Sequence, residues 1–353
     1  MKTNLFKPAP NYEELIKTLK LSDTRYIPLA ELGVHPLIKE KFLSKKIQTL
    51  NDDVEFWYKA GYDYVKLQPK VDFNPARIGL SNNLTYNDDG TVFRKWASEN
   101  SGVISNEEDF ENYIFPNPSD FDYSNFEEAA KILPEGMCII GQYGDIFTMT
   151  WEMMGFENFS ISLYENEDLV TELNKKLGEL VFNMFNQFIQ FDFVKAIWYS
   201  DDIAYTNSLM VSKDVLDKFF FPWLKKIGDL AKAYNKPFIY HTDGILYDVF
   251  EKILECGVNA IHPIEPKAMK IEEVKEKFGD KLCLIGNIDV DLLSRGTPEE
   301  IKKNVLWNLE TVGYNGGYCV GSGNSIPEYV NMDNYLMMIN TVREHNLNNK
   351  YNL

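Results

Sequence analysis

Short apolar runs alternate with longer amphipathic segments along most of this chain. About eight of the runs have the length and the β-branched or aromatic content of buried strands, and most of them end in polar residues. We expect strands within residues 24–33, 61–69, 137–144, 195–202, 236–243, 258–266, 281–289 and 316–324. The apolar spacing predicts helices over residues 11–20, 34–48, 51–60, 121–133, 166–190, 212–234, 246–255, 270–278, 298–310 and 333–345.

This alternation predicts an α/β fold with a parallel sheet. The 353 residues suit a single (β/α)8 TIM barrel, which we expect to occupy residues 1–353. An open doubly wound sheet is the rival, but its GxGxxG phosphate signature does not follow the first predicted strand. Residues 70–115 differ in character, because Asp89 and Gly90 lie between two strand-like runs. They predict a small hairpin insertion, or lid, after the second strand.

The composition narrows the classes of partner. Apolar residues make up 44% of the chain, and the net charge of −17 argues against nucleic acid or an anionic membrane as a partner. The four cysteines are widely spaced and form no CxxC pair, so we expect reduced thiols in the core. No signal-peptide stretch or transmembrane run is present, which predicts a cytoplasmic protein acting on a small molecule. The oligomeric state stays open, a homodimer included.

Polar residues at the predicted strand ends supply the candidate chemistry. In a barrel these ends converge on one mouth, which would bring together Glu31, Gln68, Gln142, Asp201, Asp202, His241, Asp243, Glu265, Asp289 and Asn324. Six of these ten residues are carboxylates and none is Arg or Lys, so a metal ion, a cationic substrate or raised pKa values could relieve the repulsion among the carboxylates. Helix capping explains each of these acids on its own as well as catalysis does, which applies to Asp202, Asp243 and Asp289.

The stretch KPFIYHTDG places a histidine and a carboxylate on the same side of an extended segment. His241 and Asp243 are two residues apart, and Glu265 follows the next predicted strand, so these three residues are candidate metal ligands. A single H-x-D pair is a weak signal, because an isolated histidine is more often structural. His262 lies inside its strand and is expected to be packed or hydrogen-bonded, whereas His35 can face the mouth or the solvent.

The strand ends, in this order, resemble the uroporphyrinogen decarboxylase superfamily, which also contains cobalamin-linked methyltransferases. The resemblance spans nearly the whole chain. It is most specific in the segments YSDDIAYTNSLMVSKDVLDKFFFPWLKKI, FIYHTDG, LIGNIDVDLLSRGTPEEI and GGYCVGSGNSIP. It implies a barrel whose mouth carries the catalytic residues Asp202, His241 and Asp243. Substrate binding would fall to Glu31, His35, Gln68, Gln142, Asp289 and Asn324.

The sequence departs from the decarboxylases of this superfamily in ways that bear on the substrate. Their arginine-rich segment after the first strand corresponds here to PLAELGVHPLIKE, which contains no arginine, and no acid stands near Gln68. A polyanionic tetrapyrrole would therefore meet carboxylates rather than guanidinium groups. The thiol-methylating members hold zinc with His-x-Cys and a later Cys. Here Asp243 and Asn324 stand at the two cysteine positions.

Two functions follow from the resemblance. The first is a methyltransferase that demethylates a small methylated compound, with zinc or another divalent metal in the mouth and a corrinoid carried by a partner protein as methyl acceptor. The alternative is a cofactor-free decarboxylase acting on a different carboxylated substrate, with Asp202 or Asp243 as the acid. A non-catalytic binding barrel is the third hypothesis.

Overall fold

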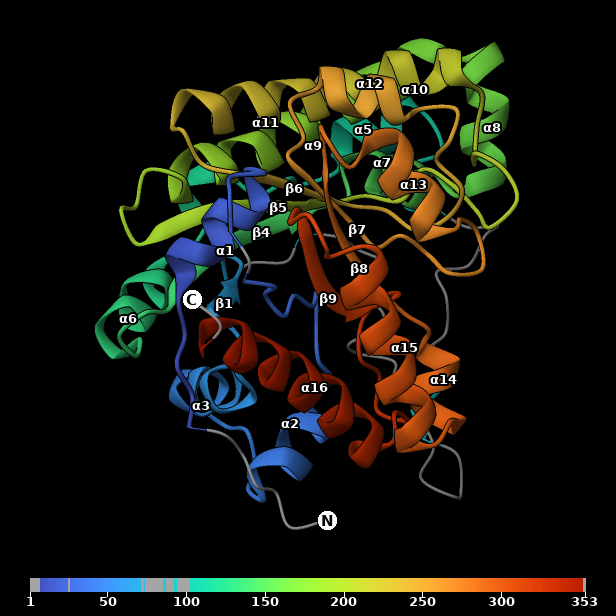
Figure 1. The fold of residues 1–353 in the computed structure, drawn as a ribbon. Coiled ribbons are helices and arrows are strands. Elements are labelled where there is room, and N and C mark those ends of the chain that lie inside the picture. The colour runs from blue at the N-terminus through green and yellow to red at the C-terminus, as the bar shows by residue number, and fades with distance from the viewer. Residues whose placement is uncertain are drawn as a thin grey trace.

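The computed structural model describes residues 7–24, 26–70, 73, 85–86, 92–93 and 102–351. Its centre is a curled sheet of seven parallel strands whose spatial order follows the chain (Figure 1). The strands are β1 (Tyr64–Leu67), β4 (Cys138–Gly144), β5 (Val194–Ser200), β6 (Phe238–His241), β7 (Ala260–His262), β8 (Cys283–Ile288) and β9 (Tyr318–Ser322). Six of them lie inside a run predicted to be a strand, and β5 begins one residue before its predicted run, which confirms the α/β class and the parallel sheet.

The expected first strand, within residues 24–33, is reduced to a single bridge between Leu29 and Val320 of β9. Pro28 explains the reduction, because it has no N–H to donate to a ladder, although its carbonyl still accepts from Val320. On the other side, the Tyr64 hydroxyl of β1 bonds to both the N–H and the carbonyl of Glu31. This segment therefore touches both edge strands of the sheet, an arrangement consistent with a TIM-barrel-like fold.

Helices surround the sheet and pack against its outer side (Figure 1). Most match a predicted segment, but α5 (Glu107–Asn112), α7 (Ile146–Met154), α8 (Phe156–Glu165) and α14 (Val290–Arg295) are additional. The predicted helix 212–234 is divided at Phe220, just before Pro222. The helices are α1 (Tyr12–Leu19), α2 (Pro36–Leu43), α3 (Leu50–Ala60), α5 (Glu107–Asn112), α6 (Ser124–Ile132), α7 (Ile146–Met154), α8 (Phe156–Glu165), α9 (Glu167–Phe188), α10 (Lys213–Phe219), α11 (Phe221–Ala233), α12 (Phe250–Glu255), α13 (Ile271–Phe278), α14 (Val290–Arg295), α15 (Pro298–Thr311) and α16 (Met332–Tyr351), with a 3₁₀ turn at Pro118–Asp120.

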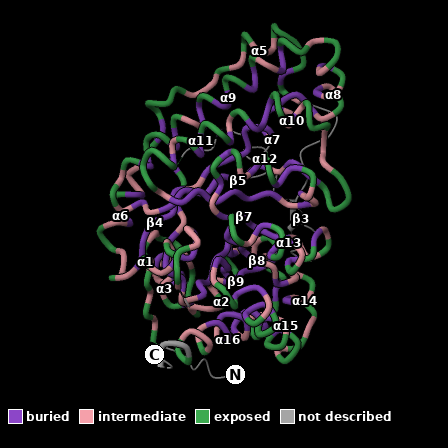
Figure 2. Tube along the Cα trace, turned by 45° about the horizontal axis from the view of Figure 1, so that its top comes forward, coloured by how far each residue is buried: buried purple, intermediate pink, exposed green. Residues whose placement is uncertain are grey.

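Burial follows the layers, with buried positions concentrated on the strands and exposed ones on the outer helix faces (Figure 2). The strands are buried along nearly their whole length because helices cover one side and the barrel interior the other. All four cysteines are buried and free, as expected for core thiols. Within the described part of the chain, no helix is both long and apolar enough to cross a membrane.

The predicted insertion over residues 70–115 is only partly described. Thr85–Tyr86 (β2) pairs antiparallel with Val92–Phe93 (β3), and α5 lies near the end of the segment. The Asp89-Gly90 turn and most of the remaining insertion lie outside the described residues. The hairpin insertion therefore stays a prediction, as does the assignment of residues 1–353 to one barrel unit.

Candidate active site

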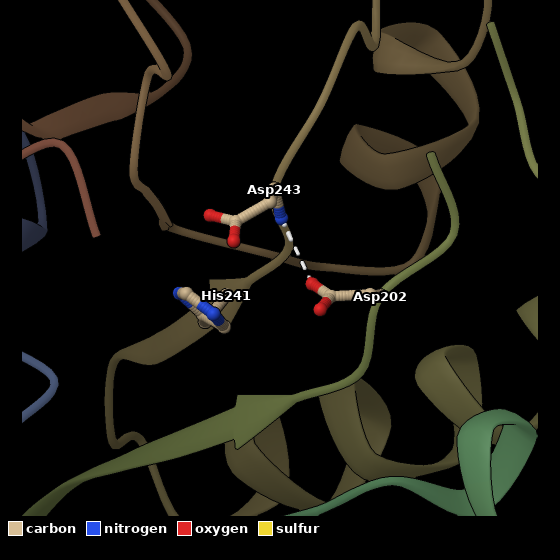
Figure 3. A group of neighbouring side chains, drawn as sticks. All are labelled: Asp202, His241 and Asp243. Carbon is tan, nitrogen blue, oxygen red and sulfur yellow. Dashed lines mark hydrogen bonds between the residues drawn. The ribbon is translucent and has the colours of Figure 1, made fainter. Parts of the chain in front are cut away.

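Three side chains meet where β5 and β6 end. His241 closes β6, and Asp202 and Asp243 each lie two residues beyond the end of β5 and β6. Ser200 is the register partner of His241, so the residues just beyond these two strands emerge side by side. One potential ligand atom from each of Asp202, His241 and Asp243 lies within 4.8 Å of the other two (Figure 3). We call these three residues the acid–histidine cluster.

Asp243 is the most strongly perturbed carboxyl of the cluster. Its Oδ2 accepts from the Asn324 side chain at 2.5 Å, whereas Oδ1 is buried without a hydrogen-bond partner among the described residues. Burial, followed by the charges of Asp202 and Glu265, raises the pKa of Asp243 to about 8. Near neutral pH this carboxyl therefore holds a proton that it can donate.

Glu265, the third candidate metal ligand, lies next to the cluster and supports the loop after β6. One of its oxygens accepts from the Gly244 N–H at 2.8 Å, and the other accepts from the Thr206 hydroxyl at 3.3 Å. Gly244 has φ of 91°, and a Cβ there would approach the Ala204 carbonyl carbon to 2.6 Å, so glycine is required at this turn. The Glu265 carboxylate thus holds the turn that carries Asp243, and its charge contributes to the raised pKa of Asp243.

His241 is buried and neutral near pH 7. Burial lowers the pKa of its imidazole to about 4, opposed by the Asp202 charge and assisted by the charge of Lys66. Its Nδ1 lies 2.8 Å from Nδ1 of His262, and that contact leaves Nε2 for the cluster. His262 is therefore a hydrogen-bonded interior residue, as its position inside a strand predicts.

A row of hydrogen-bonded polar side chains runs from β1 to β5. The expectation that site residues lie at the ends of strands, called the strand-end rule below, identifies only one of them. Lys66 donates to Gln142 at 3.4 Å, and Gln142 donates to the Ser200 hydroxyl at 3.3 Å. Gln142 was a candidate substrate-binding residue. Lys66 and Ser200 were not, because they lie within strand runs. Lys66 lowers the pKa of both His241 and His262, so the interior is not purely acidic.

Apart from Asn324, which donates to Asp243, the remaining candidate residues have their contacts outside the acid–histidine cluster. Glu31 is fully buried and accepts from the N–H and the hydroxyl of Ser322 at 2.7 and 2.6 Å, and burial raises its pKa to about 8. His35 caps α2 through Nδ1, Asp289 caps α14, and Gln68 is exposed. The capping alternative is confirmed for Asp289. Substrate binding by Glu31, His35, Gln68, Gln142, Asp289 and Asn324 stays a prediction.

Asp201 illustrates how neighbouring acids take different roles. Its carboxylate accepts from the N–H groups of Phe147 and Thr148, from the Thr148 hydroxyl and from the Tyr199 hydroxyl. These bonds satisfy the first turn of α7. Asp202 instead accepts from the Asp243 N–H at 2.9 Å and joins the cluster. Asp201 therefore stabilises the start of α7, whereas Asp202 belongs to the acid–histidine cluster.

The donor atoms of the cluster fit a divalent metal ion. One imidazole nitrogen and two carboxylate oxygens form a mixed N/O set of the kind that zinc and similar ions accept. The unpartnered Oδ1 of Asp243 is the observation that favours a ligand there, because buried polar atoms normally have a partner. A bound cation would also relieve the repulsion between Asp202 and Asp243.

Comparison with known proteins assigns the family. The sequence model described as "Uroporphyrinogen decarboxylase (URO-D)" matches residues 99–345, which include the whole acid–histidine cluster. The chain belongs to the uroporphyrinogen decarboxylase family. This confirms the resemblance seen in the sequence.

Curated members of the uroporphyrinogen decarboxylase family match over shorter segments. The chain is 37% identical over 76 residues to a uroporphyrinogen decarboxylase of Pseudoalteromonas translucida, covering 22% of this chain and 21% of the relative. It is 25% identical over 130 residues to that of Trichodesmium erythraeum, covering 36% of this chain and 35% of the relative. The matched segments thus span about a third or less of these relatives.

A solved structure matches over nearly the full length. It is described as a methyltransferase from Methanosarcina mazei, with a TM-score of 0.65 and 14% identity over 94% of this chain and 97% of the other. At this identity the likeness shows a shared fold.

Proposed function

We propose that this protein is a methyltransferase that removes a methyl group from a small methylated compound and passes it to the corrinoid of a partner protein. The observation that carries the proposal is the acid–histidine cluster, in which Asp202, His241 and Asp243 converge and Asp243 Oδ1 has no hydrogen-bond partner among the described residues. The Methanosarcina mazei neighbour, a methyltransferase by its description, gives the fold a precedent for this chemistry.

The residues of the acid–histidine cluster can supply the acid or the metal site that demethylation requires. When the bond between the methyl carbon and the heteroatom breaks, the methyl group goes to the acceptor and the heteroatom keeps the electron pair. That heteroatom must then be protonated or polarised. Without a metal, Asp243 holds a proton near neutral pH and can give it to the leaving heteroatom, because burial and the charges of Asp202 and Glu265 keep its pKa high. When a divalent metal is bound instead, His241, Asp202 and an ionised Asp243 would hold it, and the metal would supply Lewis-acid polarisation of the heteroatom.

The arginines argue against a polycarboxylate tetrapyrrole as substrate. Among the described residues, Arg295 on α14 lies 3.6 Å from Asp291 and Arg343 on α16 donates to the Lys59 carbonyl, and neither contact involves the acid–histidine cluster. Arg25, Arg77 and Arg94 lie outside the described residues. Lys66 is the basic group that acts on His241, and one lysine suits a smaller substrate with fewer acidic groups.

A second candidate function is a cofactor-free decarboxylase for another carboxylated substrate. The protonated state of Asp243 favours it, because loss of CO₂ leaves a carbanion that needs a proton. Lys66, close enough to lower the pKa of His241, is a positive group that can stabilise the carbanion left when CO₂ departs. Metal content separates the two candidates.

Two finer expectations accompany the proposal. We interpret residues 26–31 as the first strand of an eight-stranded barrel, on the strength of the Leu29–Val320 bridge and the Tyr64–Glu31 bonds. A cytoplasmic location, and a homodimer as one possible assembly, stay predictions.

The deciding experiment measures metal and methyl transfer together. Protein purified without chelator is analysed for bound metals, and methylated amines, ethers and thiols are offered with free cob(I)alamin as acceptor, followed by visible absorbance. Asp243→Asn and His241→Gln should abolish both the metal and the transfer. Asp280→Asn, at an exposed position outside the candidate site, should retain both. Efficient decarboxylation of uroporphyrinogen, or full methyl transfer by Asp243→Asn, would contradict the proposal.

A further inference from the structure

Two imidazole rings from neighbouring strands face each other behind the acid–histidine cluster. His241 and His262 are register partners in β6 and β7, and their Nδ1 atoms are 2.8 Å apart. The ring centroids are 5.0 Å apart, with an angle of 33° between the planes. A hydrogen bond between two Nδ1 atoms needs one proton, so one ring donates and the other accepts.

We propose that His262 is a positioning residue for His241. Nδ1 of His262 accepts the Nδ1 proton of His241, and the Nε2 lone pair of His241 is thereby left for Asp202 and Asp243 and for whatever they bind. The inference deepens the proposed function, since it rests on His241 serving as a ligand there. Ligating histidines usually donate their second N–H to a carbonyl or carboxylate. Here a second imidazole takes that place.

The surroundings of His262 favour this role over simple packing. The ring is fully buried, and its Nε2 has no hydrogen-bond partner among the described residues. Trp198 packs against it with ring centroids 5.1 Å apart at 71°. A buried polar group without a partner is costly, so an apolar side chain of similar shape would stabilise this position better. The contact that justifies an imidazole here is the one from its Nδ1 to His241.

The proposal also explains how the rest of the site can stay acidic. A carboxylate behind His241 would add another negative charge beside Asp202, Asp243 and Glu265, whereas an imidazole accepts the same proton without charge. The neutral acceptor still fixes the tautomer and the orientation of the ring. His241 thus presents one lone pair in one direction.

The test compares two variants that differ in whether they keep the acceptor. His262→Asn places a side-chain oxygen near the position of Nδ1, and His262→Leu removes the acceptor while filling the space. Zn²⁺ affinity is measured by calorimetry after chelator treatment, and the His241 tautomer is measured by ¹⁵N NMR of the ring in metal-free protein. His345→Asn, on α16, serves as a control for histidine replacement away from the site.

Wild type should show His241 protonated at Nδ1. His262→Leu should weaken Zn²⁺ binding by roughly 10–100-fold and shift the tautomer, and His262→Asn should recover most of the affinity. Melting temperatures identify any variant that has lost its fold.

Three results would overturn the inference: His241 protonated at Nε2 in metal-free wild type, unchanged affinity in folded His262→Leu, or equal loss in both folded variants. If wild type binds no Zn²⁺, the proposed metal site fails, but the tautomer measurement still decides the role of His262. The two failures are therefore distinguishable.

Discussion

The backbone N–H of Asp243 donates to the carboxylate of Asp202 at 2.9 Å, which fixes two acids from adjacent strand ends in contact. The bond holds the loops after β5 and β6 together, although the two carboxylates repel each other. Part of this repulsion is relieved by keeping Asp243 protonated, since its pKa is raised to about 8. The same hydrogen bond therefore organises the site and tunes its acid.

Removing the charge of Asp202 should make Asp243 a stronger acid. Asp202→Asn keeps an oxygen to accept from the Asp243 N–H but removes the negative charge, which is the second cause of the raised pKa after burial. We expect the pKa of Asp243 to fall while staying above its ordinary value, because burial persists. ¹³C NMR of labelled aspartate carboxyls measures it in metal-free protein. In the control variant Asp289→Asn, the pKa of Asp243 should not change. An unchanged pKa of Asp243 in Asp202→Asn would show that the two charges do not interact.

Replacing Asp201 and Asp202 in turn should separate stability from site chemistry. Asp201→Ala removes the acceptor for two backbone N–H groups in the first turn of α7, and we expect a loss of roughly 2–4 kcal/mol in unfolding free energy. Asp202→Ala loses one backbone hydrogen bond and a repulsion, so we expect less than about 1 kcal/mol. Urea unfolding gives both values. Zn²⁺ affinity should fall sharply in Asp202→Ala, and the reverse pattern would exchange the roles assigned to these acids.

Lys66 should hold down the pKa of His241. Burial is the largest cause of the lowering and Lys66 adds to it, so Lys66→Met should raise the pKa from about 4 while leaving it below the ordinary 6.5. NMR of the His241 ring in metal-free protein over a series of pH values measures this pKa directly. Lys70→Met, four residues further on and exposed, should leave it unchanged. A fall in the His241 pKa on Lys66→Met would mean that the lysine acts through packing instead of charge.

The sequence predicts the fold more completely than the site. Buried strands are short apolar runs whatever surrounds them, so β1 and β4 through β9 lie where periodicity places them. The first strand fails as a ladder because Pro28 lacks a donor, and one predicted helix divides before Pro222. Helix α7 was missed because its first turn is satisfied by Asp201, a residue more than fifty positions later in the chain.

For the site, the strand-end rule works where residues follow a strand and fails within one. It brings Asp202, His241, Asp243 and Glu265 to neighbouring loops. Lys66 and His262 lie inside strand runs, and whether such residues face the interior depends on a register that one sequence does not reveal. A charged residue in an otherwise apolar strand was the available signal for Lys66.

Asp63 should make the protein less stable as the pH rises from about 4 to about 7. Its carboxyl is fully buried and accepts from the Asn11 N–H and the Tyr26 hydroxyl, and burial raises its pKa from 3.8 to about 7. The folded state therefore favours the protonated form. This contribution is fully present below about pH 4, declines as the pH rises from there to about 7, and is absent above.

Asp63→Asn keeps an oxygen acceptor and removes the ionisation, so its stability relative to wild type should rise by on the order of 2–4 kcal/mol between pH 4 and pH 8. Chemical unfolding at a series of pH values measures the difference. Asp280→Asn, at an exposed position, gives the matched baseline and should show a flat difference. If the stability difference between Asp63→Asn and wild type is also independent of pH, the buried carboxyl does not titrate in this range. The pH dependence of stability must then come from other groups. Glu31 is the first of these to test, because its pKa is also raised by burial.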